Sequence, residues 1–184
     1  MVSSLPPTDA PTTTGLLEER VWQALRTVRD PEIPVLDVVE MGIVRGVVAG
    51  TGAAPATLTV TITPTFSACP ALHEIRRCVR EAATSAIEAA GHGAGYDVDV
   101  VTTLYPPWSS DDMTPTARDK LERFGIAPAQ PHGGLLELAL EAPVRCPRCG
   151  HPDTRVRNTF GSTLCREIRS CRACDETFER FKPL

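Results

Sequence analysis

Apolar and polar positions along the first part of the chain follow two different periods. Between residues 16 and 28, apolar side chains recur every three or four positions and charged ones occupy the opposite face, which predicts an amphipathic helix with Leu17, Val21, Leu25 and Val28 on its buried side. The helix must end before the segment DPEIP, because two prolines cannot continue it. Residues 43–49 then predict a strand after a turn at Met41-Gly42.

The next stretch alternates with a period of two. Leu58, Val60 and Ile62 alternate with threonines over residues 57–63, the pattern of a strand with one buried face. Helical spacing returns over residues 70–90, and the segment GHGAG ends that helix. A third strand is predicted over residues 96–103. The order is α-β-β-α-β, so we predict an α+β fold with the helices on one face of a short sheet.

The remaining residues divide into connecting segments and a second unit. Thr114-Pro115 predicts a short helix to Arg123 that Gly125 closes, and Trp108, Leu121 and Phe124 are expected to fold this segment back onto the first unit. We expect a disordered tail over residues 1–15, a first domain over 16–126, a linker over 127–143 with a short strand at 135–140, and a second domain over 144–184.

Composition and charge narrow the function. The net charge is −4, but residues 145–184 carry nine basic and five acidic side chains (+4), which leaves ten and eighteen (−8) for residues 1–144. Aromatic residues make up 5%, too few for a surface that stacks bases. No segment has the roughly 18 apolar residues of a membrane span, and the N-terminus lacks the regions of a signal peptide. We therefore expect a cytoplasmic protein in which seven cysteines act as metal ligands or working thiols rather than as disulfides.

Four of the cysteines have the spacing of a zinc ribbon. Cys146 and Cys149, and then Cys171 and Cys174, form two Cys-x2-Cys pairs that are 21 residues apart. Each pair can direct two sulfurs to one point, four sulfurs satisfy tetrahedral Zn2+, and the spacer is long enough for a β-hairpin. A unit of about 40 residues also needs a metal to fold. Spacing alone leaves an iron–sulfur cluster on the same sulfurs open.

Two further side chains are candidates for extra ligands of this ribbon site. Cys165 precedes Cys171 by six positions, and His151 follows Cys149 by two. Either could replace one of the four paired cysteines as a metal ligand. The simpler interpretation of Cys165 is a small side chain on a ribbon strand.

A fifth cysteine stands at the start of the second predicted helix. Cys69 occupies the expected N-cap position before Pro70, where Ser, Thr or Asp is usual. It could be a buried small side chain, a nucleophile or a ligand. The positive end of the helix dipole should favour its thiolate. His73 lies one helical turn further along and could form a Cys–His pair or face solvent, whereas Cys78 falls near the apolar stripe.

Residues of about 16–125 resemble the MIP18-like (DUF59) family of iron–sulfur cluster assembly factors. The segments that carry the resemblance are DPEIPVLDVVEMGIV, TLTVTITPTFSACPAL and WSSDDMTPTARDKLERFGIAP. With the C-terminal segments CPRCG and NTFGSTLCREIRSCRACDETFERFK, nearly the whole chain resembles the family of accessory D subunits of the 1,2-phenylacetyl-CoA epoxidase system. The family's functional positions correspond to Cys69 and to Asp30, Pro31 and Glu32, and its ribbon ligands to Cys146, Cys149, Cys171 and Cys174.

This resemblance implies a helper rather than a catalyst. Its clients would be the di-iron oxygenase subunit, the reductase subunit that carries flavin and an iron–sulfur cluster, or both. It also implies zinc in the ribbon and transient iron or an iron–sulfur cluster at Cys69. Two alternatives are a general iron–sulfur cluster carrier and a ribbon that binds nucleic acid. The second is weakened because two zinc-bound cysteine pairs would lower the positive charge of the ribbon. A thiol enzyme that uses Cys69 is a further one, but it lacks a clear His/Asn constellation. A homodimer through sheet edges is compatible with so small a domain.

Overall fold

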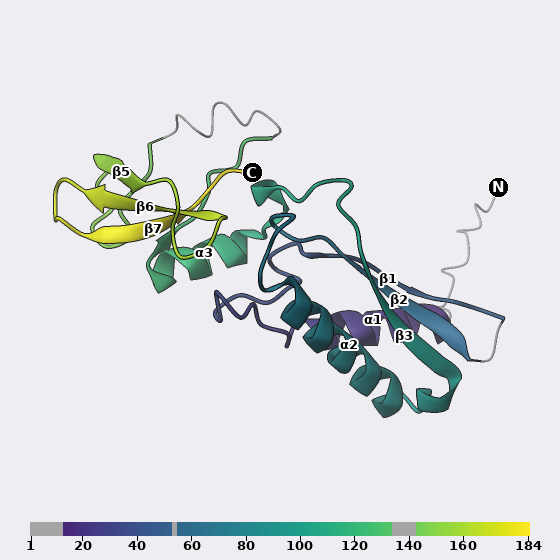
Figure 1. Cartoon of the computed structure of the whole chain (residues 1–184). Coiled ribbons are helices and arrows are strands. Elements are labelled where there is room, and N and C mark those ends of the chain that lie inside the picture. The colour runs from purple at the N-terminus through teal and green to yellow at the C-terminus, as the bar shows by residue number, and fades with distance from the viewer. Residues whose placement is uncertain (1–12, 53–54, 134–142) are drawn as a thin grey trace, which may run out of the picture.

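The computed structural model describes residues 13–52, 55–133 and 143–184. Figure 1 shows a larger lobe that holds the two long helices and the first sheet, and a smaller lobe at the C-terminal end of the chain. In the first lobe the elements are α1 (Thr13–Leu25), β1 (Val44–Ala49), β2 (Ala56–Ile62), α2 (Leu72–Ala89), the short helix η1 (Gly93–Gly95) and β3 (Tyr96–Thr102). The predicted α+β fold and the order of its elements are confirmed.

The first sheet has the strand order β1-β2-β3. β1 and β2 are antiparallel, and β2 and β3 are parallel, joined by α2 as a crossover helix. α1 contacts β1, α2 contacts β3, and the two helices contact each other, so both cover one face of the sheet (Figure 1). The alternation predicted for β2 is confirmed: Leu58, Val60 and Ile62 are fully buried, while the two threonines between them are half-buried.

Three helix boundaries differ from those predicted. α1 starts at Thr13, so the last three residues of the tail that was expected to be disordered over 1–15 are helical. α1 ends at Leu25 rather than at Val28, because the backbone N–H groups of residues 26–28 bond to carbonyls three residues back and tighten the chain into a turn. α2 starts at Leu72 rather than at Pro70, and its N-cap is Ala71. Cys69 therefore lies in a turn before the helix and is not the N-cap residue.

The segment between the first sheet and the second follows its prediction closely. The short helix η2 (Ser110–Asp112) precedes α3 (Pro115–Phe124), whose N-cap Thr114 accepts a hydrogen bond from Ala117 N and whose C-cap Gly125 is left-handed. Trp108 is buried in the first core, and its Nε1 donates to Met41 O at 2.9 Å. Leu121 joins the same core. The prediction that Phe124 also packs onto the first unit was wrong, because its side chain is 49% exposed.

The second sheet has the strand order β4-β7-β6-β5. Its strands are β4 (Ile126–Ala127), β5 (Thr154–Asn158), β6 (Arg166–Cys171) and β7 (Thr177–Phe181). The hairpin expected between the two cysteine pairs is present as β5 and β6. β4 pairs in parallel with β7 and is an edge strand of this sheet. Its two residues lie at the expected boundary between the first domain and the linker. The strand expected at 135–140 lies outside the described residues.

The second lobe also packs onto the first. Phe181, the last residue of β7, is fully buried in the core of the first lobe, with its ring centroid 5.7 Å from that of Trp108. Leu184 O accepts hydrogen bonds from Ser110 N and Ser109 Oγ. The two lobes are thus held together by the apolar contact between Phe181 and Trp108 and by hydrogen bonds to the carbonyl oxygen of Leu184. Over the described residues, no helix is long and apolar enough to cross a membrane.

Gly42 is the point where the loop after α1 meets η2. Its φ is +72°, and a Cβ there would lie 2.5 Å from Asp112 O. Gly42→Ala should therefore lower the free energy of unfolding by at least about 1–3 kcal/mol, the usual cost of a strained backbone conformation. Urea unfolding measures it. Gly46→Ala is the matched control, because the space around Gly46 is open. Equal losses in the two variants would contradict this prediction.

Candidate metal and thiol sites

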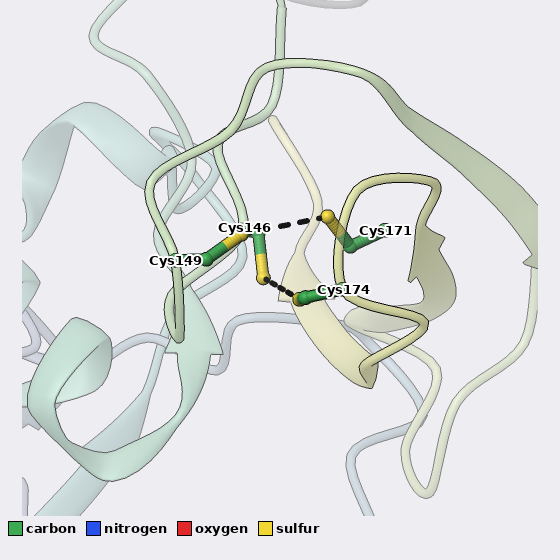
Figure 2. Close-up of side chains that lie close together, drawn as sticks. All are labelled: Cys146, Cys149, Cys171 and Cys174. Carbon is green, nitrogen blue, oxygen red and sulfur yellow. Dashed lines mark hydrogen bonds between the residues drawn. The ribbon is translucent and has the colours of Figure 1, made fainter.

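The four ribbon cysteines meet at one point. Each of their Sγ atoms lies within 4.8 Å of the others, and the closest pairs are Cys149–Cys171 at 3.6 Å and Cys146–Cys174 at 3.8 Å (Figure 2). A tetrahedral zinc ion with Zn–S bonds of about 2.3 Å holds its sulfurs about 3.8 Å apart. The four side chains therefore fit a structural zinc site with shifts of no more than about 1 Å in their sulfur separations.

The two Cys-x2-Cys turns have the same backbone geometry. In each, the N–H of the first cysteine donates to the carbonyl five residues later, Cys146 to His151 and Cys171 to Glu176. The fourth residue after the first cysteine has a positive φ in both turns: Gly150 at 72° and Asp175 at 56°. The paired spacing in the sequence thus produces two matching knuckles at one end of the hairpin.

Without an ion, the ribbon thiols share their protons unevenly. The backbone N–H of Glu176 lowers the pKa of Cys174, but hydrogen bonding with Cys149, Cys171 and Cys146, together with burial, raises it to about 12. Burial raises the pKa of Cys171, but hydrogen bonds from the backbone N–H groups of Ala173 and Cys174 and from the Cys149 thiol lower it to about 7. Four thiolates at this separation repel one another. A divalent ion reduces that repulsion, because it replaces the thiol protons and offsets two of the four negative charges.

The two extra ligand candidates lie away from these four sulfurs. His151 is exposed, and its Nδ1 accepts a hydrogen bond from Asp153 N at 3.1 Å. Cys165 stands in the turn before β6, where its Sγ lies 3.1 Å from Thr163 Oγ1. Its side chain faces the first lobe rather than the knuckles, for it lines a cavity there.

That cavity brings together the two motifs of the first lobe. It has a volume of about 30 Å³ and lies between the loop after α1, the turn before α2 and the ribbon. Its walls include Asp30, Glu32, Cys69 and Cys165, with Met41, Phe66, Leu164 and Phe181 as apolar neighbours. Segments as far apart in the sequence as Asp30 and Cys165 therefore line one cavity.

Asp30 shapes the loop on one side of this cavity. Its Oδ1 accepts hydrogen bonds from the backbone N–H groups of Glu32 at 2.7 Å and Ile33 at 2.8 Å, which holds the proline turn closed. The residue is only 6% exposed, and burial raises the pKa of its carboxyl group. Pro31 is exposed, and Glu32 extends toward the ribbon, where its Oε2 lies 4.0 Å from Arg166 Nη2. Asp30, which could have been a solvated acid, is instead part of the cavity wall.

Cys69 is half-buried at the other side of the cavity. Burial raises the pKa of its thiol, and so do the charge of Asp30 and the nearby Cys165, although the N–H groups of Ala71 and Leu72 act in the opposite direction. The expectation that the helix start would favour the thiolate was therefore wrong. The N–H groups do face the sulfur, but the loss of water outweighs them.

Two other candidates from the second helix lie outside the cavity. His73 is exposed and lies beside Arg76 and Arg77 on the outer face of α2, so it does not form a pair with Cys69. Cys78 is half-buried, and its Sγ donates to Glu74 Oε1 at 3.5 Å. This thiol is remote from both sulfur sites and provides a control for experiments on them.

Sequence reasoning missed that Cys165 and Phe181 belong to the Cys69 cavity. Both residues belong to the predicted second domain, and the periodicity of a sequence predicts local structure but not which domains are in contact. The one available signal was Cys165 itself, a cysteine without a place in the paired spacing of the ribbon.

Two family models match the two halves of the chain. The family model for an iron–sulfur cluster assembly protein matches residues 18–93, and the model for the PaaD zinc beta ribbon domain matches residues 131–182. A crystal structure of a DUF59 domain of unknown function from Bacillus anthracis is 25% identical and has a TM-score of 0.49, covering 59% of this chain and 94% of that one.

Two protein relatives extend the match in sequence. A factor from Porphyromonas gingivalis named as an Fe-S protein maturation auxiliary factor is 37% identical over 100 residues, which is 54% of this chain and 86% of the relative. The protein from Escherichia coli that is assigned as the D subunit of 1,2-phenylacetyl-CoA epoxidase is 39% identical over 163 residues, which is 88% of this chain and 90% of the relative. The chain therefore belongs to the family of these epoxidase D subunits, in which an iron–sulfur cluster assembly domain is joined to a PaaD zinc ribbon.

Proposed function

We propose that this protein is a non-catalytic accessory subunit of a phenylacetyl-CoA epoxidase and helps to mature its di-iron or iron–sulfur centre. One observation carries the proposal: Cys69, Asp30 and Glu32, from two separate motifs of the cluster-assembly domain, line one cavity. A thiol and carboxylates are ligands that iron accepts. The clients are the di-iron oxygenase subunit, the iron–sulfur flavin reductase, or both, and the iron is cargo rather than a resident cofactor.

The size of the cavity favours an accessory role over catalysis at this site. Sites for organic substrates usually have volumes of roughly 300–1,000 Å³. The cavity beside Cys69 has about 30 Å³, which admits a metal ion or a water molecule but no acyl-CoA. The Cys69 thiol is therefore poorly placed to attack a substrate and well placed to hold an ion.

Cys69→Ala is expected to lower epoxidase activity several-fold in cells that express the complete epoxidase system with this protein as its sole accessory subunit. Phenylacetyl-CoA turnover in extracts and the iron content of the purified oxygenase and reductase measure the effect. Ribbon zinc and the unfolding midpoint of the variant should stay close to wild type, because the thiol is only half-buried at the edge of the core, beside a cavity.

Cys78→Ala is the matched control, since that half-buried thiol of α2 lies outside the cavity. Wild-type activity in Cys69→Ala would remove this thiol from the function. An equal fall in both variants would mean that activity follows the stability of α2 and not the chemistry of the cavity.

A further inference from the structure

We propose that Cys149 is the site at which hydrogen peroxide oxidises the zinc ribbon, and that it then forms a disulfide with Cys171 of the other knuckle. A second peroxide joins Cys146 to Cys174 in the same way. The two disulfides then connect the knuckles in place of the metal, so the ribbon loses its zinc but keeps its fold. This inference goes beyond the proposed function, because it concerns the ribbon and involves no client.

The four ribbon sulfurs differ in how easily an oxidant can reach them. Cys146 and Cys171 are each 1% exposed and Cys174 is half-buried, whereas Cys149 is exposed. A zinc ion holds all four sulfurs as thiolates, which is the form of cysteine that reacts with a peroxide. Cys149 is therefore the ribbon thiolate that a small oxidant in solution meets first.

The three cysteines outside the knuckles are less prepared for this reaction. Burial raises the pKa of Cys69 and of Cys165, and burial and the hydrogen bond with Glu74 raise the pKa of Cys78. A raised pKa leaves a smaller share of each cysteine as the nucleophilic thiolate. Peroxide should therefore act on the ribbon before it acts on the cavity beside Cys69.

Two short sulfur–sulfur distances span the two knuckles. Cys149 Sγ lies 3.6 Å from Cys171 Sγ, and Cys146 Sγ lies 3.8 Å from Cys174 Sγ (Figure 2). A disulfide holds its sulfurs about 2.05 Å apart, so the sulfurs of each pair must approach by less than about 2 Å. Oxidised Cys149 thus has Cys171 as a ready partner on the other knuckle.

One molecule of peroxide is consumed for each disulfide. The Cys149 thiolate attacks a peroxide oxygen, the O–O bond breaks, and a sulfenic acid forms while hydroxide leaves. The Cys171 thiolate then attacks the Cys149 sulfur, the S–S bond forms, and a second hydroxide leaves. Each sulfur has lost one electron, and the peroxide has been reduced to two hydroxide ions. The two remaining thiolates cannot satisfy a tetrahedral zinc ion, which is therefore released.

The span of each linkage determines what happens to the ribbon. Cys149 and Cys171 are 22 residues apart and Cys146 and Cys174 are 28 apart, so both disulfides connect the two knuckles across the hairpin. Disulfides that close long loops restrict the unfolded chain most. A disulfide inside a single Cys-x2-Cys turn would instead leave the knuckles unconnected once the zinc is lost.

The test uses the complete, zinc-loaded protein and hydrogen peroxide alone. A chromogenic chelator records zinc release, and mass spectrometry of non-reduced tryptic peptides identifies the linkages. Trypsin separates the cysteines of each pair, because an arginine stands inside each turn, Arg148 in the first and Arg172 in the second. We expect about one zinc released per chain, with Cys149–Cys171 as the first linkage, whereas protein without peroxide should keep its zinc.

A trap for sulfenic acid identifies the cysteine that reacts first. With less than one equivalent of peroxide, dimedone should label Cys149 several-fold more than any other cysteine. Cys78→Ser and Cys165→Ser should release zinc at the wild-type rate, because neither thiol takes part. Linkage within one knuckle, label mainly on another cysteine, zinc that stays bound, or slower release in Cys165→Ser would each overturn the proposal.

Limited proteolysis measures whether the oxidised ribbon stays folded. Oxidised, zinc-free protein should resist cleavage over residues 144–184 as the zinc-loaded protein does, and iodoacetamide should alkylate its Cys69 as slowly. Zinc-free protein that a phosphine keeps reduced should be cleaved there, and its Cys69 should react several-fold faster. Rapid cleavage of the oxidised ribbon would show that the disulfides do not replace the metal, and the proposal would fall.

Discussion

Cys171→Ser is expected to abolish zinc binding and unfold the ribbon over residues 144–184. The metal is the main source of stability there, because the buried apolar cluster of this unit consists of Ala127, Val144, Cys146, Cys171 and Phe178, and two of its members are themselves ligands. Structural zinc sites contribute on the order of 10–16 kcal/mol of binding free energy to folding. Nothing in a core of this size can replace such a contribution.

Zinc per chain and limited proteolysis measure this loss. The variant should contain less than a tenth of the wild-type zinc, and cleavage should concentrate in the ribbon while the first lobe resists. Cys78→Ser is the matched control, because it also exchanges a thiol for a hydroxyl but lies on α2. Full zinc and wild-type protease resistance in Cys171→Ser would show that the four-sulfur site does not hold the ribbon together.

Loss of the ribbon should also open the cavity beside Cys69. Thr163, Leu164, Cys165 and Phe181 form one wall of it. Alkylation of Cys69 should therefore become several-fold faster in Cys171→Ser than in the wild type. An unchanged rate would mean that the ribbon does not shield this thiol. The zinc site, though separate from the cavity, would then have no influence on it.

Local patterns in the sequence were sufficient for most of the elements. The alternation of Leu58, Val60 and Ile62 identified β2, and Thr114 and Gly125 marked both ends of α3, because strands and helix caps depend on neighbours in the chain. The four-cysteine spacing likewise identified a metal site, since each knuckle is a local turn with fixed geometry.

What depends on contacts between distant residues was not predicted. The pKa of Cys69 rises because of burial by the folded chain, which the identity of its neighbours in sequence does not reveal. Cys165 was assigned either to the zinc or to a ribbon strand, and its place beside Cys69 depends on how β7 docks against the first lobe. The short β4 had no signal, because two residues are too few to show a period.

Phe181→Ala is expected to lower the free energy of unfolding by about 3–5 kcal/mol, the usual cost of deleting a buried phenylalanine. The side chain is fully buried in the core of the first lobe although it belongs to β7 of the second. Its ring is tilted by 51° to that of Trp108, with centroids 5.7 Å apart. Urea unfolding measures the loss, and Phe124→Ala, at a side chain that is 49% exposed, should cost far less.

The same substitution tests whether the two lobes share one folding unit. Phe181 also lines the Cys69 cavity, so its removal should both loosen the ribbon and admit solvent to the thiol. Phe181→Leu keeps most of the apolar volume and should restore most of the stability and the slow alkylation of Cys69. If Phe181→Ala instead matches Phe124→Ala in stability, the docking of β7 contributes little. The ribbon would then be a tethered module, and Cys165 would not be held at the cavity that Cys69 lines.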